Sequence, residues 1–358
     1  MHKPDTHESS KAGRNLRTIA IVGVFILLAF YTLWIARAFF LPVTLACLLS
    51  FLLRPVVRAL EKVSVPRTAA AAIVLAAFLG TVALGLIELY GPALKWIEGA
   101  PNSLRRVEKK VRRLLEPAEH MGNAMDQVEK ITGVDDEDDT KKMELKEPGP
   151  SHSVFSWTRR LLFGPVVMFV LLYFLLASGD LIVRRLVQLL PRVQDKKRVV
   201  DIARETEQKI SGYLFTLAVI NACLGGAVGL VMHFLQMPNP LLWGVMAALL
   251  NFIPLLGPIF SFFVIAMVSL LQFDSLGQAC IAPLFYLGLH SLESNVITPM
   301  ILGKRLALNT IVIFVSLVFW GWLWGVPGAA IAVPLLMTFK IICEQIHDLR
   351  PISDFLSK

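Results

Sequence analysis

The sequence is poor in charged residues. Asp, Glu, Lys and Arg make up 17% of its 358 residues, whereas soluble domains average about 25%. Hydrophobic residues reach 55% and the mean hydropathy is +0.63. The chain therefore lacks the polar surface that a water-soluble globule of this length needs, and it is too apolar for a disordered or collagen-like protein.

Long stretches of the sequence carry no Asp, Glu, Lys or Arg at all. A helix needs roughly 17–25 apolar residues to cross a bilayer, and several of these stretches reach that length. The charge-free runs are residues 18–36, 38–53, 68–87, 161–179, 210–273, 275–292 and 306–339. We therefore predict an all-α protein that crosses the lipid bilayer several times.

Motifs that carry enzymatic or metal chemistry are missing as well. The cysteines Cys47, Cys223, Cys280 and Cys343 are isolated, without Cys-x-x-Cys or Cys/His spacing, so we expect no metal site, no disulfide and no cofactor. No phosphate-binding glycine loop, Gly-x-Ser-x-Gly or dinucleotide fingerprint is present. The sequence therefore predicts a protein that is not an enzyme.

Basic residues are concentrated between the apolar runs. They outnumber acidic residues in segments 1–17, 54–67, 180–209 and 299–305. Basic residues near the ends of spans stay in the cytoplasm, so we place these segments and both termini on the cytoplasmic side. The excess of basic residues behind the net charge of +8 then lies on the cytoplasmic side of the membrane. No nucleic-acid partner is needed to explain it.

The resulting path has about six spanning helices. The first run is longer than the 7–15-residue core of a typical signal peptide, so we predict that it remains as a span. The predicted spans are 18–36, 38–53, 68–90, 157–178, 213–236 and 276–298.

Two further runs, 241–271 and 306–339, are too long for one span and contain residues that break helices. As continuous helices they would measure roughly 46–51 Å, against a hydrocarbon core of about 30 Å. The breaking residues are Pro254, Gly257 and Pro258 in the first run and Gly325, Gly328 and Pro334 in the second. We predict two re-entrant hairpins; the alternative is a protein of eight conventional, kinked spans.

The C-terminal half repeats its own pattern. Residues 213–271 and 276–339 each consist of a span followed by a broken run. The first begins inside the cell and the second outside, which predicts an inverted repeat. In many secondary transporters such repeats bring broken helix ends together near the bilayer midplane around a solute, and we expect the two breaks to meet there.

Polar residues within apolar runs are costly in a membrane and therefore mark candidate sites. Asn251, His290, Glu293 and Asn295 are such residues. His290 precedes Glu293 by three positions, on the same helical face, and we expect the two side chains to hydrogen-bond. The four residues are candidates for binding a small polar solute or cation and for coupling its movement to a proton; the alternative is that Glu293 is a structural carboxylate.

One polar stretch, 96–155, separates the third and fourth spans. Its apolar residues between Leu104 and Val128 recur at alternating spacings of three and four, which is typical of a helix that contacts another helix or lies on lipid headgroups. We expect Pro117 to kink or split this helix. The pattern predicts a homo-oligomer, with packing onto its own chain as the alternative. The acidic run 135–139 lacks the spacing of a calcium loop.

Three segments resemble the autoinducer-2 exporter family. They are NFIPLLGP at 251–258, LESNVITPMILGK at 292–304 and GVPGAAIAVP at 325–334. The resemblance adds Pro299 and Gly303 to the expected hinge positions. It implies a secondary transporter of the bacterial inner membrane that exports a small polar molecule, such as a furanone-type quorum-sensing signal.

The resemblance also leaves other functions open. Some relatives are described as sodium/proton antiporters, and homo-oligomers with an elevator-like movement are described for others. A channel and a membrane scaffold protein are the remaining alternatives. The expected organisation is a scaffold of three spans at 1–95, an extracytoplasmic segment at 96–155, a fourth span with a cytoplasmic amphipathic helix at 156–209, a transport core at 210–340 and a cytoplasmic tail at 341–358.

Overall fold

The computed structural model describes residues 21–25, 27–119, 150–179, 193–273, 275–303, 308–346 and 349–357. These residues are almost entirely helical. The β-structure among them is an isolated antiparallel bridge between Leu308 and Ser357. The prediction of an all-α chain is therefore confirmed. The acidic run 135–139 and the basic pair Lys304 and Arg305 lie outside the described residues.

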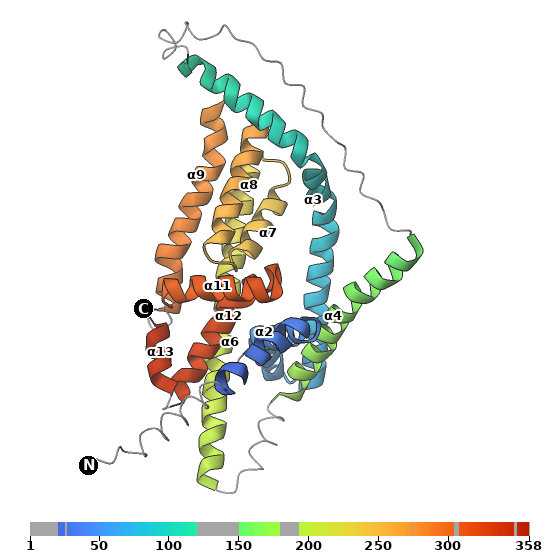
Figure 1. Ribbon diagram of the computed structural model, residues 1–358, viewed down its shortest axis with the longest axis vertical. Coiled ribbons are helices and arrows are strands. Elements are labelled where there is room, and N and C mark those ends of the chain that lie inside the picture. The colour runs from blue at the N-terminus through green and yellow to red at the C-terminus, as the bar shows by residue number, and fades with distance from the viewer. Residues whose placement is uncertain are drawn as a thin grey trace, which may run out of the picture. The chain divides into compact units, whose positions relative to one another are not determined.

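Figure 1 shows the helices of the described chain, coloured from the N-terminus to the C-terminus. Residues 21–35, apart from residue 26, are helical. The later elements are α2 (Arg37–Lys62), α3 (Arg67–Glu119), α4 (Pro150–Ser178), α6 (Val193–Phe234), α7 (Pro240–Leu250), α8 (Leu256–Gln272), α9 (Leu276–Leu292), the π-helix η1 (Glu293–Ile297), α10 (Thr298–Leu302), α11 (Thr310–Trp324), α12 (Val326–Gln345) and α13 (Arg350–Leu356).

Four segments of these helices are long and apolar enough to cross a membrane. They are Arg37–Lys62, Arg67–Glu98, Val200–Phe234 and Val326–Gln345. The other apolar helices of the described chain have 10–17 residues. Several membrane crossings are thus consistent with the structure, as the charge-free runs predict.

Inter-residue contacts divide the chain into two compact units. Unit 1 consists of Met1–Leu75, Phe163–Phe215 and Lys304–Lys358, and unit 2 consists of Ala76–Leu162 and Thr216–Gly303. In unit 1 the apolar core includes Ala46, Val57, Ala70, Leu172 and Leu176. In unit 2 it includes Val228, Met232, Trp243, Ile265 and Tyr286.

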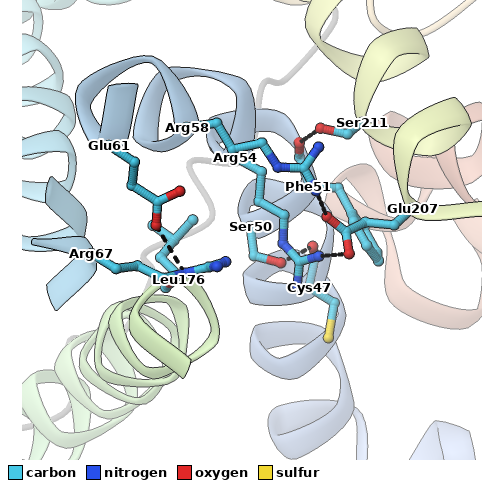
Figure 2. Close-up of polar contacts among 10 residues, drawn as sticks. All are labelled: Cys47, Ser50, Phe51, Arg54, Arg58, Glu61, Arg67, Leu176, Glu207 and Ser211. Atoms are coloured by element: carbon cyan, nitrogen blue, oxygen red, sulfur yellow. Dashed lines mark hydrogen bonds and ion pairs between the residues drawn. The ribbon is translucent and has the colours of Figure 1, made fainter. Parts of the chain in front are cut away.

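A group of ion pairs around the buried Glu207 carboxylate connects α2 with the first part of α6 in unit 1 (Figure 2). The Glu207 carboxylate pairs with Arg54 Nη1 at 2.5 Å and also with Arg58. The side chain of Glu207 is 9% exposed and that of Arg54 11%. One turn further along α6, Ser211 Oγ donates to the Phe51 carbonyl oxygen at 2.5 Å. These contacts, called the Glu207 cluster below, hold α6 against α2.

Two helices extend beyond their predicted ends. α2 continues from the predicted end at residue 53 to Lys62, because Arg54 and Arg58 pair with another helix instead of lying in a loop. α3 continues from residue 90 to Glu119 and passes through Pro117. A proline removes one hydrogen bond and bends a helix, but it does not have to end it.

Each broken run forms two helices that pack against each other. In unit 2, α7 has 11 residues and α8 has 17, or about 16 and 25 Å. In unit 1, α11 has 15 residues and α12 has 20, or about 22 and 30 Å. α7, α8 and α11 are thus shorter than a hydrocarbon core of about 30 Å. The breaks near residues 254 and 325 are confirmed.

The two helical pairs share details of construction. A glycine near the start of each second helix lies against a carbonyl of the first: Gly257 against Leu250 in unit 2, and Gly328 against Trp320 in unit 1. A Cβ atom at either glycine would overlap that carbonyl oxygen. The residue directly before each second helix also has a positive φ, 66° at Leu255 and 71° at Gly325.

The expected second break at Pro334 is wrong, because α12 runs without interruption from Val326 to Gln345 with Pro334 inside it. Packing explains this continuity. Pro334 and its neighbour Val333 are buried, and Ser316 Oγ of α11 donates to the Ala332 carbonyl at 3.3 Å. Neighbouring helices and hydroxyl groups commonly satisfy the backbone near a proline in apolar surroundings.

Candidate solute and coupling site in unit 2

Small residues allow α6 and α7 to approach each other closely. A Cβ atom built on Gly225 would lie 2.6 Å from both the Ala248 Cβ and the Gly244 carbonyl oxygen. One built on Gly244 would lie 3.1 Å from the Gly229 Cα. Residues four apart lie on one face of a helix, so the pair Gly225/Gly229 faces the pair Gly244/Ala248. We call this contact the glycine seam.

Two asparagines extend the glycine seam towards the hairpin tip. Asn221 lies one turn before Gly225 on α6, and Asn251 follows the last residue of α7. Asn251 Nδ2 donates to Asn221 Oδ1 at 2.9 Å. Asn221 is 1% exposed, and its own Nδ2 has no hydrogen-bond partner among the described residues. Sequence reasoning marked Asn251 but could not predict its partner 30 positions away.

The tip between α7 and α8 is a tight turn around Leu255. This residue has φ 66° and ψ −59°, and Leu256 N donates to the Pro254 carbonyl at 2.8 Å. These values describe a γ-turn, which is strained for a residue other than glycine. Pro254, Gly257 and Pro258 thus lie at the break, as predicted.

Glu293 is buried at the beginning of η1. Its residue is 6% exposed, and Thr298 Oγ1 donates to Glu293 Oε1 at 2.5 Å. His290 Nδ1 lies 3.6 Å from Glu293 Oε2, so the two side chains are adjacent as expected from their spacing. The expected hydrogen bond is not formed, because this distance exceeds the hydrogen-bond range; His290 Nδ1 is buried and without a hydrogen-bond partner among the described residues.

The π-helix was not predicted. In a regular α-helix the ring of Pro299 would clash with the carbonyl group of Asn295, four residues earlier. The wider turn of η1, in which Thr298 N bonds to the Glu293 carbonyl, relieves this clash. π-helical turns are frequent at functional sites, and here one begins at the candidate carboxylate.

Tyr286 connects the surroundings of Glu293 with the hairpin tip. Its ring stacks on His290 with a centroid distance of 6.2 Å and an interplanar angle of 7°. Its hydroxyl donates to the Pro258 carbonyl at 3.3 Å, and the residue is 1% exposed. Side chains therefore link Glu293, His290 and Tyr286 to the start of α8. A single tyrosine in an apolar run gave no sequence signal for this role.

The other predicted residues are less closely associated with these groups. Asn295 is exposed, and its Nδ2 donates to the Ser291 carbonyl of its own helix at 2.9 Å. Pro299 lies in the first turn of α10, and Gly303, with φ 72°, ends it. The roles of these residues, and of Gly325, Gly328 and Pro334, in binding or movement stay predictions. Among the described residues, no group of His, Cys, Asp and Glu could hold a metal ion.

The close approach at Gly257 predicts a strong effect of a single methyl group. Gly257→Ala should destabilise unit 2 by about 1–3 kcal/mol or more, because the new Cβ overlaps the Leu250 carbonyl. Gly277→Ala in α9 is the control, since a Cβ there meets nothing within 4 Å. Thermal unfolding of the detergent-purified protein measures both. Equal unfolding temperatures for the two variants would contradict the close packing of α7 on α8.

Comparison with known proteins assigns the chain to a family. A family model described as AI-2E family transporter matches residues 24–348. A relative named "Putative transport protein" from Borreliella burgdorferi is 30% identical over 192 residues, 53% of each chain. The AI-2 transport protein TqsA of Escherichia coli K12 is 32% identical over 136 residues, which is 38% of this chain and 39% of TqsA.

Most of these alignments are partial. The chain spans about half or less of the length of the Borreliella, Haemophilus influenzae and Escherichia coli relatives. An alignment with YrrI of Bacillus subtilis 168, also named as a transport protein, covers 93% of this chain and 94% of YrrI at 22% identity. Because the family model covers most of the sequence, the chain belongs to the AI-2E family of transporters.

Proposed function

We propose that the chain is a secondary transporter of the bacterial inner membrane that exports a small polar solute of the AI-2 type. The family and the name of TqsA support transport and this class of solute. The four helices that are long and apolar enough to cross a membrane support a multi-pass arrangement. The observation that carries the proposal is the buried carboxylate of Glu293 in unit 2.

Glu293 has the surroundings of a coupling group. The contacts that the structure describes for its carboxylate come from a hydroxyl and an imidazole, Thr298 and His290. Neither is a permanent cation. An ionisable residue within an apolar membrane run is a functional-site candidate, and we assign to this carboxylate the binding of the coupling ion. Movement of either through this group would couple solute export to an ion gradient.

The architecture that we propose has about six spans and two re-entrant hairpins in an inverted repeat. The short lengths of α7, α8 and α11 support re-entrance. The shared glycine contacts at Gly257 and Gly328 and the positive φ before α8 and α12 support a repeat. Cytoplasmic termini follow from the distribution of basic residues, and a homo-oligomer from the apolar pattern in 104–128.

A sodium/proton antiporter is the second candidate function. The same observation favours it, since a buried carboxylate next to a histidine could exchange a proton for a cation. In this case the ion is the substrate and no organic solute moves. A channel or a scaffold protein would not require Glu293 to change its charge.

Flux measurements in proteoliposomes separate these functions. For the proposed exporter we expect saturable movement of AI-2 that is accelerated by an imposed proton or sodium gradient. An antiporter would instead show sodium-dependent proton movement without AI-2. Non-saturable flux that ignores every gradient would indicate a channel, and absence of any flux would contradict a transport function.

A further inference from the structure

The asparagine pair of unit 2 has a hydrogen-bond donor that no described residue uses. The mutual bond occupies one N–H of Asn251 and one lone pair of Asn221. Each carboxamide has two N–H donors and an oxygen with two lone pairs. Asn221 Nδ2 is buried, and no described residue accepts from it.

A purely structural role does not account for this surplus. The glycine seam already brings α6 and α7 together through backbone contacts of Gly225, Gly229 and Gly244. A buried donor without a partner carries a desolvation cost that an apolar side chain would avoid. A polar pair at this place therefore suits a bound ligand whose oxygen accepts a hydrogen bond from Asn221 Nδ2.

The charge of the surroundings defines the chemistry of that group. From residue 238 to residue 273, which includes α7, the tip and α8, the sequence has no ionisable side chain. Two amides in such surroundings can bind a hydroxyl or a carbonyl, but they cannot neutralise a carboxylate or an ammonium group. The titratable residues of unit 2 that were described above, Tyr286, His290 and Glu293, belong to α9 and η1.

We propose that Asn221 and Asn251 form a binding subsite for an uncharged hydroxyl or carbonyl group of the transported solute. Asn221 Nδ2 is the donor that recognises it, and the Asn251 bond holds the Asn221 side chain in position. This inference rests on the proposed function and narrows it. Solute recognition belongs to the neutral amide pair at the tip, and ion coupling belongs to Glu293.

Leucine variants distinguish this role from a structural one. Asn221→Leu and Asn251→Leu each leave one amide without its partner, whereas the double variant removes both amides and restores apolar packing. We expect the double variant to unfold at the wild-type temperature or above. If the pair binds solute, its KM for AI-2 in proteoliposomes should rise at least tenfold with little change in maximal rate. Ser269→Ala, which removes a buried hydroxyl that has no hydrogen-bond partner among the described residues, is the control and should keep the wild-type KM.

Direct binding makes the test independent of transport. Thermal shifts of the purified full-length protein are measured with AI-2, with erythritol and with acetate. We expect stabilisation of the wild type by the hydroxylated probes, loss of this stabilisation in the double variant and no effect of acetate. A wild-type KM in the double variant, an equal shift in both proteins, stabilisation by acetate alone or no shift with either hydroxylated probe would overturn the proposal. Wild-type shifts without any flux would contradict the transport function and leave the subsite supported.

Discussion

Glu293→Gln is expected to abolish gradient-driven transport while the protein still folds. The amide has nearly the same shape as the carboxylate, and its oxygen can still accept the hydrogen bond that Thr298 donates to Glu293 Oε1 at 2.5 Å. It can neither bind a proton nor neutralise a cation. We expect coupled flux to fall at least tenfold, a loss of about 1.4 kcal/mol of transition-state stabilisation or more.

The measurement is AI-2 flux in proteoliposomes under imposed proton and sodium gradients between pH 6 and pH 8. Ser294→Ala is a matched control, because Ser294 lies in the same π-helix but is exposed, and its hydroxyl donates to the Ser291 carbonyl. Thermal unfolding shows that both variants are folded. Normal, gradient-dependent transport by Glu293→Gln would mean that the carboxylate is structural and that coupling occurs elsewhere.

Glu207→Gln is expected to destabilise unit 1 by about 3–5 kcal/mol, the cost of removing one partner from a buried ion pair. The Glu207 carboxylate faces two guanidinium groups, those of Arg54 and Arg58. The amide cannot balance either charge, and Arg54 stays buried with its side chain 11% exposed. The attachment of α6 to α2 should therefore weaken.

A second glutamate on the same helix provides the comparison. Glu205 pairs with Lys209 at 2.9 Å, but its side chain is 56% exposed. Exposed pairs of this kind contribute little because the solvent screens their charges, so Glu205→Gln should lower the unfolding temperature much less. Thermal unfolding in nanodiscs compares the two variants. Similar losses in both would show that burial of the Glu207 cluster has no energetic consequence.

Local features of the fold were predictable from the sequence because they depend on residues close together in the chain. Proline and glycine in a run too long for one span predicted the break at Pro254–Pro258, and the structure has a γ-turn there. The spacing of three residues predicted that His290 and Glu293 lie side by side. The expected break at Pro334 failed because tertiary packing around α12 outweighs the effect of one proline.

Features that depend on distant residues were not predictable from one sequence. Arg58 and Glu207 are 149 positions apart. The basic residues around position 58 predicted only that this segment lies on the cytoplasmic side of the membrane. The bond between Asn221 and Asn251 requires the register of α6 against α7, which is set by the close approach of Gly225 and Gly244. The link through Tyr286 likewise depends on how α9 packs on α8.

The short helices α7 and α11 also constrain the order in which the helices can pack during synthesis. α7 emerges from the ribosome after α6, so Gly225 and Gly229, the α6 side of the glycine seam, are already in place when this 11-residue helix is made. For α11 the order is reversed, because α12, the helix on which it packs, is synthesised after it. A nascent chain that stops between residues 325 and 345 would hold an apolar helix of 15 residues that has its contacts with Phe30 and Leu33 but lacks those with a complete α12. Packing of α11 against its neighbours is therefore complete only after α12 has been synthesised.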